Sequence, residues 1–157
     1  MAAGDAIIVK GDNIELQDTS SSALIHDSYV ELTTAVATEQ AGKPFGVFEF
    51  TTASSAFSGA LTDGAALHIF QRTYGDSGTG TLSEAVSANN QERRVGTIYL
   101  SIANNTSQHV YREMFPVWPD GGKFVVRFSD GDSNSTITVT AGWKMDYRPT
   151  SYGVSSS

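Results

Sequence analysis

The sequence predicts an all-β protein: an antiparallel β-sandwich, jelly-roll-like, with an extended N-terminal arm. Three observations lead to this fold class. Apolar and polar residues alternate with a period of two along much of the chain, clusters of turn residues separate the alternating stretches, and 157 residues fit one domain best. About eight or nine short strands, mostly joined by short turns, are typical of two packed antiparallel sheets.

The first half of the chain contains five strand candidates. They cover residues 6–10, 13–17, 29–34, 46–52 and 66–72. Phe48 and Phe50 flank Glu49 in the fourth, and Leu67 and Ile69 share one face of the fifth. Turn residues divide these stretches at Gly11-Asp12, Gly42-Lys-Pro44 and Thr62-Asp-Gly64.

The second half continues the alternation. Its strand candidates are residues 97–102, 110–115, 124–129 and 136–146. In the last of them one face carries five apolar residues, namely Ile137, Val139, Ala141, Trp143 and Met145. This pattern predicts one long half-buried strand with Trp143 in the core.

Residues 75–92 interrupt this pattern because they show no alternation. Within them Thr81-Leu-Ser-Glu84 matches a capping box, which favours a short helix that Asn89-Asn90 would end. A long irregular excursion in a compact sandwich is otherwise more often functional or contact-making than idle. Both interpretations stay open at this point.

The two ends of the chain carry little hydrophobic bulk. We therefore expect an extended arm over residues 1–22, a sandwich domain over 23–149 and a flexible tail over 150–157. The opening residues lack the basic and long apolar regions of a signal peptide, and no stretch approaches the ~18 apolar residues of a membrane span. These features predict synthesis in a cytoplasm and no membrane partner.

Charge and cysteine content exclude several classes of function. The chain has 17 acidic and 10 basic residues, a formal net charge of −7, and no cysteine. Disulfides and cysteine-based metal or catalytic sites are excluded. The acidic balance argues against nucleic acid as a partner, since phosphate binding needs a basic surface.

The stretch Asp130-Gly-Asp132-Ser-Asn134 resembles the start of a calcium loop. A helix–loop–helix site would need Gly at the sixth position and Glu at the twelfth, where this chain has Ser135 and Ala141. We therefore interpret it as a polar hairpin connection, with a weak cation site as the other interpretation.

The other motifs are also incomplete. Gly75-Asp76-Ser77-Gly78 surrounds the nucleophile of trypsin-like proteases, but adjacent strand residues point to opposite faces, so Asp27 is not expected to orient His26. No lysine follows Gly80 to make a phosphate-binding loop. The three histidines have no metal-ligand spacing. The sequence thus predicts no catalytic residue, no metal and no cofactor.

Aromatic and apolar residues are the best interface candidates. Phe115-Pro-Val-Trp118-Pro119 is an apolar, proline-interrupted stretch near a sheet rim. Aromatic residues together with arginine are enriched in protein interfaces. The predicted interface residues are Ile7, Ile8, Val9, Phe115, Trp118, Tyr147, Arg148 and Tyr152.

This combination of features resembles the cement or decoration proteins of tailed bacteriophages. The resemblance is carried by the alternating stretches GTIYLSIANN at 96–105 and GKFVVRFSDGDSNSTITVTAGWKMDYRP at 122–149. It implies a structural virion protein on the outer capsid surface, made in the host cytoplasm, that binds the major capsid protein and forms a homotrimer. In that setting Ile7, Ile8 and Val9 would add a strand to a neighbour's sheet edge.

Two other functions fit the same composition. One is a carbohydrate- or receptor-binding β-sandwich of a fibre or lectin type, using Trp118, Tyr111 and Asp120 as a stacking platform. Another is a hydrolase whose two carboxylates come from distant strands. No residue pattern points to such a pair, and the chain is not expected to be an enzyme.

Overall fold

The computed structural model describes residues 4, 6–37, 43–74, 81–91, 93–100 and 106–154. One sheet contains β1 (Ala6–Lys10), β2 (Ile14–Gln17), β5 (Phe45–Thr51), β8 (Val110–Pro116) and β11 (Lys144–Val154). A second contains β4 (Tyr29–Glu31), β6 (Ala66–Arg72), β7 (Arg94–Tyr99) and β9 (Lys123–Ser129). A two-stranded sheet joins β3 (Leu24–Ile25) to β10 (Thr138–Val139). Among the described residues no helix is long and apolar enough to cross a membrane.

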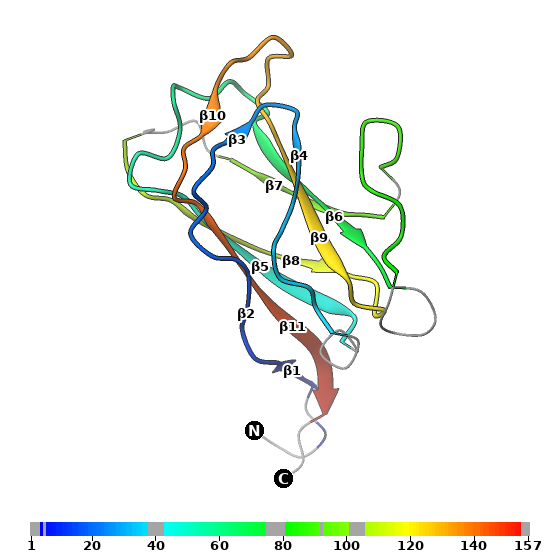
Figure 1. Ribbon diagram of the computed structural model, residues 1–157. Helices are drawn as coiled ribbons and strands as arrows, with labels where there is room; N and C mark the ends of the chain where they lie inside the picture. Colours follow the sequence, from blue (N-terminus) through cyan, green and yellow to red (C-terminus); the bar gives the residue numbers. More distant parts are fainter. Residues whose placement is uncertain are drawn as a thin grey trace.

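The strand pairing is that of a jelly roll. In chain order, β2 pairs with β11, β4 with β9, β5 with β8, and β6 with β7. The pairs are nested inside one another and belong alternately to the first and the second sheet (Figure 1). All these pairings are antiparallel, so the predicted all-β, jelly-roll-like sandwich is confirmed.

The predicted long strand over residues 136–146 is wrong. The chain forms only β10 at Thr138–Val139 and starts β11 at Lys144. Between them Gly142 has a φ of 101°, a left-handed conformation that ends the pleat, and its N–H donates to the Ser20 carbonyl at 2.7 Å. Trp143 follows this turn and is 1% exposed, which confirms its predicted place in the core.

Of the two interpretations left open for residues 75–92, the short helix does not form in residues 81–91. Ser83 instead pairs with the end of β6: its N–H donates to the Thr73 carbonyl at 2.9 Å. The Arg72 guanidinium donates to the Ser83 carbonyl at 3.0 and 2.8 Å. These bonds satisfy backbone groups that a first helical turn would need, and the segment stands beside β6 in Figure 1.

The core lies between the two sheets and is rich in aromatic rings. Phe48 and Tyr147 come from the first sheet and Phe124 from the second, and their ring centroids lie 5.0 to 5.1 Å apart. Phe50, Trp143 and Phe128 extend the same layer, and each is at most 1% exposed. The rings therefore bridge the sheets by direct contact.

The first and last strands of the chain pair with each other. β1 runs antiparallel to β11, from Ala6 opposite Val154 to Lys10 opposite Thr150, and Figure 1 shows the two side by side. Sequence reasoning placed residues 6–10 in an extended arm and residues 150–154 in a flexible tail. In the structure the apolar arm residues add a strand to the edge of the chain's own sheet; the domain division at residues 22 and 149 stays a prediction.

Replacing Gly46 tests the packing of the aromatic core. A Cβ atom at this position would lie 2.0 Å from Cε2 of Tyr147, so Gly46→Ala is expected to cost about 1–3 kcal/mol of unfolding free energy. Chemical denaturation monitored by fluorescence measures it. In a Tyr147→Leu background the clashing ring atoms are absent and the substitution should cost much less. An equal cost in both backgrounds would contradict this packing.

Candidate functional site

The outer face of the first sheet is built from residues that alternate with the core residues. On β5 the inward side chains Phe48 and Phe50 alternate with Phe45, Val47 and Glu49, which face outward. Residues directly opposite in an antiparallel pair point to the same side of the sheet. The registers with β8 and β11 therefore define the other side chains of this face.

One end of this face is apolar. Ile8 of β1 lies opposite Tyr152 of β11, Val47 lies opposite Met114 of β8, and the Tyr152 ring contacts Phe45 edge-on at 5.2 Å. Ile8 is 55%, Tyr152 60% and Met114 39% exposed. Single exposed apolar residues are ordinary, but side chains gathered on one face of a sheet mark an interaction site. We call Ile8, Phe45, Val47, Met114 and Tyr152 the apolar patch.

The other end of the face is charged. The Arg112 Nε donates to Oε2 of Glu49 at 2.8 Å. One strand further, Lys144 and Asp146 form an ion pair at 3.7 Å. Arg148 is exposed and lies opposite Val47, where the two ends of the face meet. An apolar area with a charged rim is the usual composition of a protein-binding surface.

Three of the predicted interface residues lie together here, namely Ile8, Arg148 and Tyr152. The neighbours Ile7 and Val9 belong to the same strand but alternate to its opposite side. Sequence reasoning missed Phe45, Val47 and Met114. The alternation around Phe48 and Phe50 could have identified Phe45 and Val47, because both point outward once the core side of the strand is known.

Tyr147 does not belong to this face, which corrects the prediction. It points inward between Asp146 and Arg148, is 1% exposed, and packs against Phe48 and Phe124. Burial raises the pKa of its phenol to about 12. The reason is the parity of β11: an outward Arg148 fixes an inward Tyr147.

Phe115 and Trp118 also lie outside the apolar patch. Phe115 is half-buried and packs against Phe48 with ring centroids 6.0 Å apart. Trp118 is 37% exposed in a shallow groove formed with Arg94, Val95, Pro116, Val117 and Pro119. Its backbone is fixed by buried Gln71, whose amide donates to the Trp118 carbonyl at 2.9 Å and accepts from the Trp118 N–H at 3.0 Å.

The stacking platform of the carbohydrate-binding alternative does not assemble as predicted. Tyr111 stacks on Phe50 with centroids 6.3 Å apart, near the start of β8. Trp118 lies beyond the opposite end of that strand. The strand from Tyr111 to Pro116 alone covers about 17 Å at ~3.3 Å per residue, so one sugar ring does not reach both side chains.

The Asp130 loop is tightly packed against the turn at residues 62–63. The Asp130 Oδ1 accepts a hydrogen bond from the Thr62 N–H at 2.8 Å, and a Cβ at Gly131 would lie 1.8 Å from the Asp63 carbonyl oxygen. Burial raises the pKa of Asp130, but hydrogen bonds from Ser135 and Thr62 outweigh it and hold the pKa below 3.8. No group of three or more potential metal-ligating side chains occurs in the described part of the chain.

His26 and Asp27 lie close together, although the sequence predicted them on opposite faces. The His26 Nε2 is 3.2 Å from the Asp27 Oδ2. Asp27 has a φ of 59°, and this left-handed turn breaks the strand alternation on which the prediction rested. The His26 Nδ1 accepts from the Asp130 N–H at 3.0 Å, which ties the pair to the Asp130 loop. Ser77 lies outside the described residues.

Comparison with known proteins gives only distant structural likeness. No protein-family model and no curated protein sequence matches the chain. A chain from the structure of infectious bursal disease virus Gx strain is 11% identical, with a TM-score of 0.45 over 95% of this chain and 33% of that chain. The N-terminal cellulose-binding domain of Cellulomonas fimi β-1,4-glucanase C is 12% identical, with a TM-score of 0.32 over 92% and 78%.

The chain thus spans about one third of the virus chain that it resembles. At these TM-scores neither likeness assigns a function to this chain.

Asp130→Asn tests the structural role of the polar loop. The folded pKa of Asp130 lies below its ordinary value, so its ionised form contributes stability above pH 3.8, which is lost as the pH falls through the folded pKa. We expect the variant to lose about 1–2 kcal/mol of unfolding free energy at neutral pH, and the difference from wild type to shrink in acid. Urea denaturation across pH measures both. Asp63→Asn, at an exposed neighbouring acid, is the control and should keep nearly the unfolding free energy of wild type at neutral pH.

Proposed function

We propose that the chain is a structural virion protein that binds the outer surface of an assembled phage capsid and stabilises it. The observation that carries this proposal is the apolar patch with its charged rim on the outer face of the first sheet. The patch lies on paired strands rather than on loops, so its shape is fixed before binding and little conformational entropy is lost. The major capsid protein is the proposed partner.

A cement function needs surface complementarity and no chemical step. A protein that binds only the assembled shell shifts the equilibrium towards assembly by mass action. Its own net charge of −7 keeps free copies apart until they meet the shell. We further propose that three copies assemble on the capsid as a homotrimer.

Co-sedimentation with emptied, expanded heads of the virus that encodes the chain tests this function. Wild type should pellet with the heads and raise the temperature at which they break. Tyr152→Ser removes the most exposed member of the apolar patch and should weaken binding about tenfold or more, because a buried interface tyrosine commonly contributes over 1 kcal/mol.

The matched control is Tyr99→Ser. Tyr99 is 73% exposed at the end of β7 on the second sheet, so the same substitution there should leave head binding unchanged. If the two variants weakened head binding equally, the apolar patch would not be the capsid-binding surface. Absence of wild-type protein from the pelleted heads would refute the cement function itself.

A carbohydrate- or receptor-binding module is the second candidate, favoured by Trp118. A half-exposed tryptophan beside Arg94 and Pro116 in a groove is a surface on which a sugar ring can stack. This function predicts that the free protein binds members of a glycan array and that Trp118→Ala abolishes the signal. If the chain is instead a cement protein, the wild-type protein should bind no glycan of the array.

A further inference from the structure

The outer face of the second sheet carries a row of polar side chains from four neighbouring strands. Tyr29 of β4, Arg127 of β9, His68 of β6 and Thr97 of β7 are register partners across the sheet. On β6 the neighbours of His68, Leu67 and Ile69, are fully buried in the core, so the row faces away from it.

Hydrogen bonds fix the roles of the side chains in this row. The Arg94 Nη2 donates to the Thr97 Oγ1 at 2.8 Å and also contacts the His68 Nδ1. A guanidinium only donates, so the Nδ1 accepts and neutral His68 carries its proton on Nε2. Burial and the charges of Arg94 and Arg127 lower the pKa of His68 to about 4, against the smaller opposite effect of Asp27. The ring is thus neutral near pH 7, with an N–H donor left over.

Charge around the row is only partly balanced. Arg127 pairs with Asp27 at 2.7 Å, while Arg72 and Lys123 share Glu31. Exposed Arg94 differs, because no carboxylate of the described residues lies within 4 Å of it.

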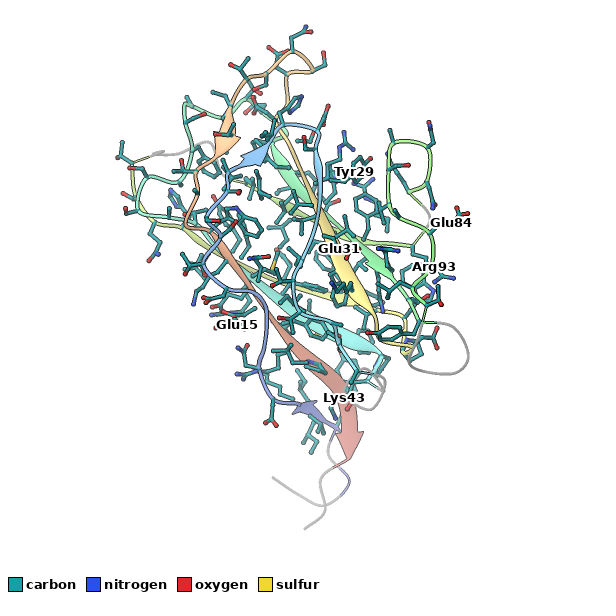
Figure 2. The ribbon with its side chains drawn as sticks, in the orientation of Figure 1. Glu15, Tyr29, Glu31, Lys43, Glu84 and Arg93 are labelled. Carbon is teal, nitrogen blue, oxygen red and sulfur yellow. The ribbon has the colours of Figure 1, made fainter. Side chains whose placement is uncertain are left out.

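The row is also held in place from one side. The Tyr29 ring lies 5.7 Å from the Arg127 guanidinium and 5.7 Å from the ring of Phe70. The Gln91 side chain donates to the Tyr29 hydroxyl at 2.7 Å. Figure 2 shows Tyr29 over the second sheet, beside the segment that carries Glu84 and Arg93. The donors of Arg94 and His68 therefore lie on a fixed support.

We propose that Arg94, with His68 and Thr97 beside it, binds a carboxylate of an acidic segment of a partner protein. The hydrogen bonds to Thr97 and His68 use only Nη2 of Arg94, so donors on Nε and Nη1 can each bond to a carboxylate oxygen. Charge complementarity favours an acidic peptide. A nucleic acid is disfavoured because its extended polyanion would meet the net charge of −7 over the rest of the surface.

This site is separate from the apolar patch. It lies on the outer face of the opposite sheet, so the two surfaces can be tested one at a time. A substitution in one surface leaves the other surface intact. The carboxylate site is therefore tested independently of the proposed cement function.

Nuclear magnetic resonance of the full chain with N-acetylated hexaglutamate amide tests the site. In ~20 mM NaCl the peptide should bind saturably, shift the signals of β6, β7 and β9, and raise the pKa of His68 because its carboxylate offsets the charge of Arg94. Arg94→Ala should weaken binding about tenfold or more. Arg94→Lys keeps the charge but loses the separate Nε and Nη1 donors, and its binding should be intermediate.

Lys43→Ala is the matched control, since Lys43 precedes β5 and lies near the lower part of β11 in Figure 2. It should bind hexaglutamate as wild type does. Unchanged affinity in Arg94→Ala would overturn the proposal. The proposal would also be overturned if inorganic phosphate bound as tightly as the peptide and shifted the same signals. The site would then bind free anions in general. Thermal unfolding of each variant verifies its fold.

Discussion

The structure depends on the contact between three rings in the middle of the sandwich. Phe48 and Tyr147 belong to adjacent strands of one sheet, and Phe124 to the other. Each pair contributes about 0.5–1.5 kcal/mol beyond the area that it buries. The contact also fixes parity: because Phe48 and Tyr147 point inward, Val47, Glu49, Asp146 and Arg148 must point outward. The core therefore decides which side chains form the outer face of the first sheet.

Much of the fold could be predicted because alternation reports burial directly. The stretches around Phe48, Leu67 and Phe124 have one core side each, and all became strands at nearly the predicted residues. Alternation failed where a single backbone angle changed the chain direction. The left-handed Gly142 split one predicted strand, and the left-handed Asp27 brought His26 and its carboxylate together. Aspartate adopts the left-handed conformation more often than most residues, but its presence alone does not predict that angle.

The candidate surfaces were harder to predict than the core. Tyr147 and Tyr152 look alike in sequence, yet one is buried and the other is 60% exposed. Their difference follows from odd spacing along β11, which becomes visible only when the register with β5 is known. Likewise, the row of Tyr29, Arg127, His68 and Thr97 joins residues up to 98 positions apart in the chain. Local patterns do not contain long-range pairing, so the sequence placed neither surface completely.

The jelly-roll strand order explains why the outer faces of the two sheets carry different kinds of side chain. A jelly roll puts neighbouring pairs of strands alternately into the two sheets, so residues close in sequence are divided between opposite sides of the molecule. Met114 on β8 and Arg94 on β7 thus reach different surfaces, one with exposed apolar side chains and the other with an exposed guanidinium. Apolar contact and charge pairing respond differently to salt, since screening weakens only the second. The proposed contact at the apolar patch should therefore persist as the salt concentration rises, while the proposed carboxylate contact at Arg94 weakens.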